Sequence, residues 1–301
     1  MSIDQARIIT AVKTPYKCNG KVDVNRFLSN IELQINGNVE GIVVAGTTGE
    51  GHLLSNEECI QLIQHAVRIF GQEIVIIGNT GGNSTSSVVK LTQAGFDVGM
   101  DASLQVNPYY GLTSPEGLTE HFDKVLELGK VILYNIPSRT GQSIPIEVIK
   151  HLSYNKNFQG IKECMSFERL NQLKILGVNV WSGDDLTFFD YYSAGLVFGT
   201  ISVMANLIPN ITSDVILGNN THHNDKYYNE LKFTLAEYQN PIAINAAMAM
   251  IDIANPVFKL PYVPPAQQYL DKLYSLLSSM YDDGILFHQP RKLNREHFSI
   301  I

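Results

Sequence analysis

The sequence has no apolar run near the ~20 residues that a helix needs to cross a bilayer, so it predicts no membrane span. Basic residues form no stripe, and the 22 Lys and Arg are outnumbered by 29 Asp and Glu, for a net charge of −7. Nucleic acid and anionic membranes are therefore poor partner candidates. Residues 1–5 lack the charged leader and apolar core of a signal peptide. We expect a soluble protein of the cytoplasm, and a plastid protein without its transit peptide would look similar.

Cysteine is scarce as well. Cys18, Cys59 and Cys164 lie far apart and show no metal-type spacing, which indicates reduced thiols of an intracellular protein. No histidine is close in sequence to Cys164, so we expect a buried thiol there and not a nucleophile. The pair His222-His223 lies in a polar stretch, which predicts a solvated loop more readily than a metal site. An apolar content of 45% excludes general disorder and is ordinary for a globular enzyme.

Short apolar runs rich in β-branched residues recur along the first 200 or so residues, with helical patterns between them. They are continuous and not alternating, as is typical of parallel strands buried on both faces. A helix start is indicated by Ser114-Pro115, an N-cap followed by proline at the first helical position. Strand and helix alternate eight times, which predicts an α/β fold of the (β/α)8 TIM barrel type. The expected strands are 7–12, 41–45, 73–78, 102–106, 131–135, 158–162, 179–182 and 196–203.

A doubly wound open sheet would produce the same alternation. It requires a Gly-x-Gly-x-x-Gly loop after the first strand, and residues 11–15 contain no glycine. After about residue 207 the strand patterns stop, and helical patterns continue over 225–239, 242–253 and 267–280 between prolines. We therefore expect a barrel catalytic domain over 1–207 and a C-terminal helical extension over 208–301.

A lysine stands within the sixth apolar strand. Barrel enzymes place their reacting groups at the carboxyl ends of the strands, where Lys162 falls. Burying an ammonium group is costly unless it is paired or deprotonated. A structural pair with Glu163 is the alternative, but neighbours on a strand point to opposite faces. Deprotonating an ordinary lysine at pH 7 costs about 4.6 kcal/mol, so a desolvated lysine with a lowered pKa is suited to Schiff-base formation.

Three other loops offer groups of matching chemistry. Tyr134 ends the preceding strand and should face the same mouth as Lys162, either moving protons or packing as an ordinary aromatic. Thr47 and Thr48 lie between glycines and would suit a carboxylate, although a plain turn explains them equally. Arg139 follows in a loop, where it would grip a second carboxylate or make a surface ion pair.

Together these motifs resemble the dihydrodipicolinate synthase and N-acetylneuraminate lyase family. The resemblance extends from residues 10–16 to residues 260–264 and comprises five motifs in the family's order. Two of the motifs are shared by the whole family: the threonine loop (residues 46–50, Gly-Thr-Thr-Gly-Glu) and the lysine strand (residues 158–162). The run 134–141 (Tyr-Asn-Ile-Pro-Ser-Arg-Thr-Gly) is typical of the synthases, and 49–51, 160–164 and 260–264 resemble their plant-type branch.

The resemblance implies that Lys162 condenses with pyruvate, and that the resulting enamine attacks L-aspartate 4-semialdehyde. The product would be 4-hydroxy-tetrahydrodipicolinate, a precursor of diaminopimelate and lysine, with no metal or organic cofactor. The resemblance also implies that Tyr110 reaches into a neighbouring subunit, so the protein would be at least a homodimer and by analogy a homotetramer. The implied site consists of a proton relay (Thr47, Tyr110 and Tyr134), a pyruvate pocket (Thr47, Thr48, Gly183 and Ile201) and Arg139 on the semialdehyde carboxylate.

One departure concerns feedback by L-lysine, which inhibits many synthases at a dimer interface. Asn83 and Tyr109 match that site, whereas Ser87 replaces an acidic residue and Cys59 replaces a histidine. Loss of the carboxylate removes a charge-assisted contact worth about 1.5–3 kcal/mol. We therefore expect weak or absent lysine feedback.

Two other functions compete with the synthase hypothesis. An N-acetylneuraminate lyase or keto-sugar-acid aldolase would use the same lysine, tyrosine and threonine chemistry with a different second-substrate pocket. Arg139 favours a small carboxylated aldehyde over a polyol. A barrel that only binds or scaffolds would be expected to have lost the lysine, the tyrosines or the threonine loop, and all of them are present.

Overall fold

The computed structural model describes residues 1–218 and 222–301, with the side chains of 222–225 outside the description. Contacts divide the chain into two compact units. Unit 1 comprises Met1–Ile9, Glu40–Val44 and Asn56–Ser202, and unit 2 comprises Thr10–Val39, Ala45–Ser55 and Val203–Ile301. This division sorts residues by contact and does not test the expected boundary between residues 207 and 208, which stays a prediction.

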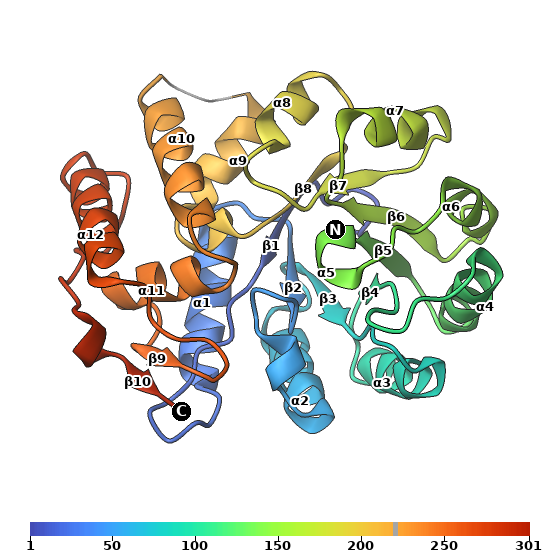
Figure 1. The fold of residues 1–301 in the computed structure, drawn as a ribbon, viewed down its shortest axis with the longest axis horizontal. Coiled ribbons are helices and arrows are strands. Elements are labelled where there is room, and N and C mark those ends of the chain that lie inside the picture. The colour runs from blue at the N-terminus through green and yellow to red at the C-terminus, as the bar shows by residue number, and fades with distance from the viewer. Residues whose placement is uncertain (219–221) are drawn as a thin grey trace. The chain divides into compact units, whose positions relative to one another are not determined.

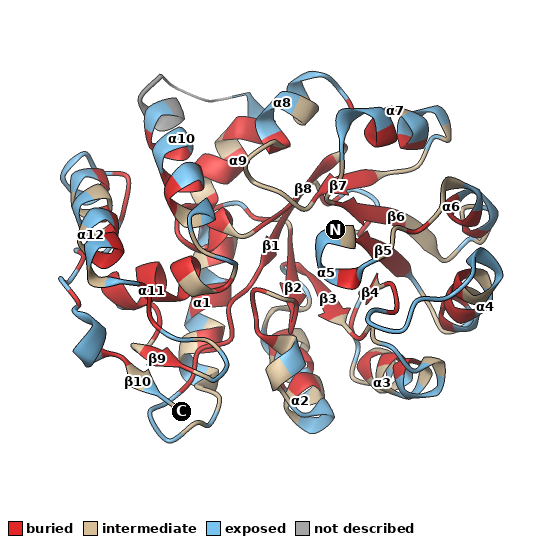
Figure 2. Ribbon diagram, in the orientation of Figure 1, coloured by how far each residue is buried: buried red, intermediate tan, exposed pale blue. Residues whose placement is uncertain are grey.

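Eight strands form a closed barrel in chain order (Figure 1). The expected TIM barrel is thereby confirmed. Nearly the whole length of each strand is buried (Figure 2), which explains why the strands are apolar without alternation. The strands are β1 (Ile8–Ala11), β2 (Gly41–Val44), β3 (Val75–Asn79), β4 (Ala102–Val106), β5 (Val131–Asn135), β6 (Phe158–Glu163), β7 (Val180–Ser182) and β8 (Gly199–Ser202).

The eighth strand is shorter than expected. It begins at Gly199, whereas the apolar run begins at Leu196. The backbone N–H of Leu196 donates to the carbonyl of Tyr191 at 2.9 Å, which closes the preceding turn. Leu196 and Val197 are buried all the same. Their hydrophobicity therefore reflects packing in a turn and not strand pairing.

The helices of unit 1 follow its strands. Ser114 accepts a hydrogen bond from the N–H of Gly117 at 3.2 Å and Pro115 opens the next helix, so the expected N-cap is confirmed. The four-residue helix that follows β5 has no counterpart in the sequence prediction. These helices are α2 (Asn56–Phe70), α3 (Thr85–Asp97), α4 (Pro115–Leu126), α5 (Pro137–Thr140), α6 (Ile146–Leu152), α7 (Phe167–Ile175) and α8 (Phe188–Ser193).

Unit 2 is mainly helical. The three helices expected after residue 207 correspond to α10 (His222–Ala236), α11 (Ile242–Met250) and α12 (Gln267–Asp282). His222-His223, expected in a solvated loop, falls in the first turn of α10, and residues 219–221 beside it lie outside the described residues. The other elements are α1 (Val24–Asn36), η1 (Gly51–Leu53), η2 (Met204–Asn206), α9 (Pro209–Leu217), β9 (Val257–Phe258), η3 (Arg295–His297) and β10 (Ser299–Ile300). Among the described residues, no helix has the length and apolar character that spanning a membrane requires.

Candidate active site

Lys162 lies near the carboxyl end of β6, in register with Tyr134 on β5. Its side chain is buried, with only 6% of the residue exposed, and its Nζ lies 4.6 Å from the centre of the Tyr134 ring. Within the part of the chain that the structure describes, no carboxylate forms an ion pair with this ammonium group. The structure therefore brings together the two residues that the sequence placed at one mouth.

Burial lowers the pKa of Lys162 below 10.5, because removing the ammonium group from water disfavours its charged form. Arg139 lowers the pKa further, while Cys164 and Asp185 oppose the shift. Burial raises the pKa of Cys164 itself to about 11, so its thiol is uncharged at neutral pH and carries no charge there to oppose the loss of the lysine proton. The environment of Lys162 therefore favours the neutral, nucleophilic amine.

Gly183 follows β7 and approaches Lys162 closely. A Cβ atom built at position 183 would lie 2.7 Å from Cε of Lys162 and 2.4 Å from Sγ of Cys164. Both distances are shorter than van der Waals contact, so only glycine allows the lysine side chain to lie along this loop. Gly183 thus has a physical role beside the lysine, although it carries no reactive group.

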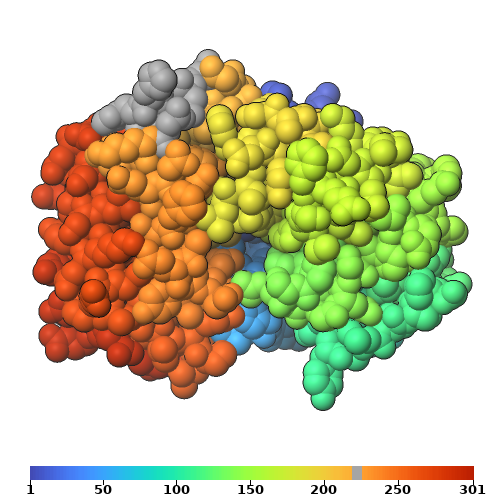
Figure 3. Space-filling model, turned by 45° about the horizontal axis from the view of Figure 1, so that its top comes forward, coloured from blue at the N-terminus to red at the C-terminus, as the bar shows by residue number. Residues whose placement is uncertain are grey.

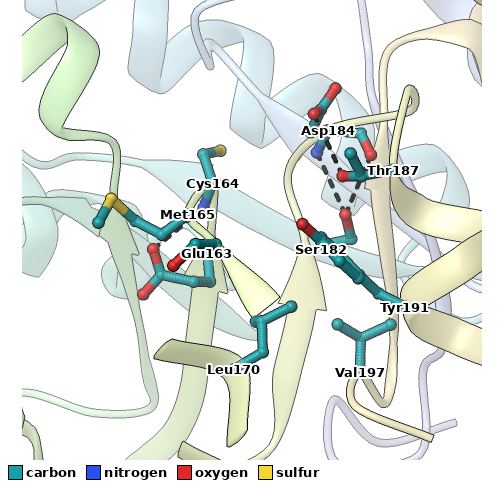
Figure 4. Close-up of a pocket in the computed structure, with 10 residues that line it drawn as sticks. Glu163, Cys164, Met165, Leu170, Ser182, Asp184, Thr187, Tyr191 and Val197 are labelled. Atoms are coloured by element: carbon teal, nitrogen blue, oxygen red, sulfur yellow. Dashed lines mark hydrogen bonds between the residues drawn. The ribbon is translucent and has the colours of Figure 1, made fainter. Parts of the chain in front are cut away.

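The loop that contains Gly183 is held by side chains along a cavity of about 270 Å³ (Figure 4). Asp184 accepts hydrogen bonds from the N–H of Leu186 at 3.0 Å and from the hydroxyl of Thr187 at 3.2 Å. Ser182 donates to the carbonyl of Asp184 at 3.1 Å. These bonds fix the turn after β7, so the close approach of Gly183 to Lys162 is built into a well-bonded loop.

Glu163 does not pair with Lys162, as the alternation of side chains along a strand predicted. Its carboxylate accepts a hydrogen bond from Nε of Arg169 at 2.8 Å and another from Nδ2 of Asn135 at 2.7 Å. Burial raises the pKa of Glu163, and Arg169 and Asn135 oppose the increase. The sequence analysis missed Arg169, which lies in the first turns of α7 and carried no motif.

The loop that carries Arg139 includes the short helix α5. Arg139 is exposed in the single chain, and its charge acts on Lys162. Ile201, the other residue expected to line the pyruvate pocket, is buried in β8. The positions of Lys162, Tyr134, Arg139 and Ile201 in unit 1 accord with a site built at strand ends, and their roles stay predictions.

Thr47 and Thr48 follow β2 and belong to unit 2. Thr48 is buried and its hydroxyl accepts a hydrogen bond from Nδ2 of Asn240 at 3.1 Å. Gly51 of this loop is required by close packing, since a Cβ there would lie 1.8 Å from the carbonyl oxygen of Ala45. The loop is therefore closely packed at Gly51 and bonded at Thr48.

Unit 2 also contains a buried lysine that the sequence analysis did not single out. Lys13 and Glu50 are fully buried and their charged atoms approach to 3.1 Å. The Glu50 oxygens lack hydrogen-bond geometry, and Lys13 donates instead to the carbonyl of Thr14 at 2.7 Å, so the contact is electrostatic. Burial lowers the pKa of Lys13, while Glu50 opposes the shift. Lys13 is thus a paired lysine at the threonine loop, in contrast to Lys162.

Tyr109 and Tyr110 lie on the loop between β4 and α4, which projects from the face seen in Figure 3. Residues 109–116 are all exposed in the single chain, and Tyr110 is 98% exposed. Tyr110 has a left-handed backbone with φ of 70°, and the N–H of Tyr109 donates to Oδ1 of Asn83 at 2.9 Å. A bulky side chain held out in a left-handed conformation is uncommon in a surface loop.

The remaining positions expected in a lysine-binding site are also in unit 1. Ser87 is exposed in the first turn of α3, and its hydroxyl donates to that of Ser84 at 3.3 Å. Cys59 is buried in α2, where its thiol lies 3.9 Å from the carbonyl of Asn79. Burial raises the pKa of Cys59 to about 12, so it is an uncharged thiol at neutral pH. Neither residue supplies a charge that would hold an ammonium group.

The family of this chain follows from its match to known sequences. A family model described as the Dihydrodipicolinate synthetase family matches residues 4–280. The chain belongs to this family. It is 47% identical over 263 residues to the chloroplastic 4-hydroxy-tetrahydrodipicolinate synthase of Zea mays, a match that covers 87% of this chain and 69% of the maize protein.

Solved structures of the same family have the same fold. Dihydrodipicolinate synthase from Acinetobacter baumannii, complexed with pyruvate, is 32% identical and superposes with a TM-score of 0.85 over 94% of this chain and 100% of its own. The enzyme from Cyanidioschyzon merolae with lysine bound is 26% identical, with a TM-score of 0.86 over 94% and 99% of the two chains. Among the described residues, no group of three His, Cys, Asp or Glu side chains is arranged to hold a metal ion.

Proposed function

We propose that the protein condenses pyruvate with L-aspartate 4-semialdehyde to form 4-hydroxy-tetrahydrodipicolinate, with Lys162 as the Schiff-base lysine. The observation that carries the proposal is the buried position of Lys162 beside Tyr134, with no carboxylate ion pair among the described residues, in a member of this family. The names of the relatives support the same reaction and do not favour an N-acetylneuraminate lyase. The enzyme would accordingly be a lyase of lysine biosynthesis.

The reaction would begin with attack of the neutral Lys162 amine on the ketone carbon of pyruvate. The carbinolamine loses water, and Tyr134 would carry the proton that this step requires; its ring centre, 4.6 Å from Nζ, supports this role. The cationic imine nitrogen withdraws electrons from the methyl carbon, which loses a proton to give an enamine. All of the covalent chemistry is carried by the lysine, so the proposed mechanism uses no metal or organic cofactor.

The second half of the reaction forms a carbon–carbon bond. The enamine carbon attacks the aldehyde carbon of the semialdehyde, and the amino group of that substrate then attacks the imine carbon, which closes the ring and releases Lys162. Arg139 would bind the semialdehyde carboxylate, because a guanidinium fork matches a carboxylate in two hydrogen bonds. The assignment of Thr47 and Thr48 to the pyruvate carboxylate rests on the family resemblance.

Tyr110 would act in the site of a neighbouring subunit. Its 98% exposure in the single chain and its left-handed backbone support a residue shaped for a partner and not for its own barrel. We propose a homodimer as the active unit and a homotetramer as the assembly. A cytoplasmic location stays a prediction, and several plant relatives are named chloroplastic.

A coupled assay tests the reaction directly. Purified protein is supplied with pyruvate and aspartate semialdehyde, and the product is consumed by a dihydrodipicolinate reductase with NADPH. Turnover should vanish in Lys162→Ala and persist in Lys174→Ala, whose lysine is exposed on α7. Borohydride with pyruvate should leave a reduced adduct on Lys162 alone. Turnover by Lys162→Ala, or an adduct on another lysine, would refute the assignment.

Subunit mixing tests the shared site. Lys162→Ala and Tyr110→Phe homo-oligomers should both be impaired, whereas hybrids prepared by denaturing and refolding the two together should regain activity. Recovery is expected because one site of each hybrid dimer would have both wild-type residues. Hybrids no more active than the average of the parents would contradict a contribution of Tyr110 across the interface.

A further inference from the structure

The loop that carries Arg139 leaves β5 after Asn135 and comes back beside Asn135 at Ile144, just before α6 begins. Its two ends are joined by the side chain of Asn135, whose Oδ1 accepts a hydrogen bond from the N–H of Ile144 at 2.9 Å. The hydroxyl of Ser143 donates to the same oxygen at 3.3 Å. A segment with its ends tied in this way has the character of a compact Ω-loop. The two ends of the loop that carries Arg139 are therefore held together by one side chain.

A second tie joins the neck to β6 and α7. Arg169 donates from Nη2 to the carbonyl of Ile144 at 2.6 Å and from Nε to Glu163 at 2.8 Å. Glu163 in turn accepts from Nδ2 of Asn135 at 2.7 Å. The guanidinium group thus bridges the return point of the loop and the residue next to Lys162, while Glu163 reaches the departure point.

The network is buried and complete. Glu163 is 2% exposed and Arg169 is 9% exposed, and no buried side-chain nitrogen or oxygen of Asn135, Glu163 or Arg169 lacks a hydrogen-bond partner. Fully satisfied polar networks of this kind are rigid, because each bond holds its neighbours in a low-dielectric setting. In Figure 4 the Glu163 carboxylate points away from the bonded group of Ser182, Asp184 and Thr187. The network therefore serves the β5 and β6 side of the site.

We propose that Arg169 is a positioning residue for the second substrate: it closes the neck of the 136–143 loop and so fixes Arg139. This inference rests on the proposed function for the identity of that substrate, the semialdehyde. Arg169 touches no reacting atom. Its effect is transmitted through Ile144 and Asn135 to Arg139, while Lys162 keeps its place in β6 through the strand hydrogen bonds.

Arg169→Lys tests whether the two hydrogen bonds of Arg169, to Glu163 and to the Ile144 carbonyl, are needed in addition to its positive charge. Lysine keeps the charge beside Glu163 but cannot donate to Glu163 and to the Ile144 carbonyl with one rigid fork. Glu163→Gln is the second variant: it leaves the Arg169–Ile144 bond available, but it removes the charge of Glu163 and turns one of its two acceptor oxygens into a donor. Arg68→Lys, on the exposed side of α2, is the matched control.

Hydrogen exchange tests the tie without reference to substrate. Peptides that cover 136–144 should exchange faster in Arg169→Lys, and to a smaller degree in Glu163→Gln, while peptides of β3 keep the wild-type rate. Unchanged exchange over 136–144 in both folded variants would overturn the proposal. Turnover by wild-type protein is a separate measurement, and its absence would contradict the proposed function while the exchange result still decides the tie.

A double-mutant cycle tests the path through Arg139. Arg169→Lys should lower kcat/KM for the semialdehyde by about tenfold, since small misplacements of a positioning group are costly. It should leave the KM for pyruvate and the borohydride adduct on Lys162 unchanged. In an Arg139→Ala background the same substitution should have almost no further effect, because coupled residues are not additive. An equal loss in both backgrounds would show that Arg169 does not act through Arg139.

Discussion

The backbone of Gly183 lies against the side chain of Lys162, so closely that a Cβ at position 183 would approach Cε of the lysine to 2.7 Å. The lysine therefore depends for its position on a glycine in the loop after β7. The same added carbon would lie 2.4 Å from Sγ of Cys164, on the other side of the contact. A methyl group at position 183 would thus clash with two different side chains, Lys162 and Cys164. The effect of the first clash on catalysis can therefore be measured apart from the effect of the second on stability.

Gly183→Ala should slow formation of the pyruvate imine by roughly a hundredfold, because the added methyl group displaces the reacting amine. Rapid borohydride trapping at Lys162 measures this rate. Adding Cys164→Ala should recover thermal stability by removing the clash with sulphur, and should leave the imine rate low because the clash with Lys162 remains. Cys164→Ala alone is the control. A wild-type imine rate in Gly183→Ala would show that the lysine does not need this contact.

Burial of Lys162 has a pH-dependent effect on stability. In the folded protein the pKa of Lys162 lies below 10.5, the value of an ordinary lysine in the unfolded chain. At a pH between the folded and the unfolded pKa, Lys162 is therefore protonated in the unfolded chain and neutral in the folded one. The contribution of Lys162 to stability therefore rises with pH across this window. Lys162→Met should be more stable than wild type below the folded pKa, and the difference should shrink towards pH 10.5 and vanish above it. Urea denaturation of both proteins over this range measures the difference, and a gap that widens with pH would contradict a lowered pKa.

The ion pair of Lys13 and Glu50 should be important for the threonine loop. Glu50→Gln keeps the size and the left-handed backbone of the residue and leaves Lys13 buried without a counter-charge. The expected loss is about 3–5 kcal/mol of unfolding free energy, as for other broken buried pairs. The double variant with Lys13→Met should recover most of it. Urea denaturation measures the unfolding free energy of each variant. Equal losses in the single and double variants would mean that Lys13 and Glu50 are not coupled.

The sequence predicted the barrel well because its strands are buried on both faces, which leaves an unambiguous apolar run at each strand. The argument that a lysine in an apolar strand indicates a reactive amine was less specific, because it considered Lys162 alone. Lys13 satisfies the same criterion of a lysine at the end of an apolar strand, yet it is paired with Glu50. Local sequence cannot separate the two cases, because the partner of Lys13 lies in another loop, 37 positions away in the chain.

Arg169 was missed for a related reason. Its contacts join β5, β6 and α7, and only tertiary packing brings Glu163, Asn135 and the Ile144 carbonyl around one guanidinium group. The alternation rule did predict that Glu163 would not pair with Lys162, since that rule depends only on neighbours along one strand. Patterns along a strand were thus readable from sequence, and networks between elements were not.

Lysine feedback should be weak. A lysine ligand needs a carboxylate for its ammonium group, and Ser87 and the uncharged thiol of Cys59 offer none, although Asn83 and Tyr109 are held together at 2.9 Å. Loss of one charge-assisted contact lowers affinity by about one to two orders of magnitude. Inhibition is measured in the coupled assay over a range of L-lysine concentrations. Strong inhibition at micromolar lysine would refute the prediction and would mean that another acidic side chain takes the place of the missing carboxylate.

Restoring the charge makes a sharper test of the same idea. Ser87→Glu places a carboxylate on the exposed first turn of α3, where a negative charge also interacts favourably with the helix N-terminus. The lysine concentration for half-inhibition should then fall by about tenfold. Ser86→Glu is the matched control, because it adds the same charge to the same turn on a different face. If both variants gain sensitivity equally, the effect is one of general charge and not of a contact at position 87. If neither does, the missing carboxylate is not what weakens feedback in this chain.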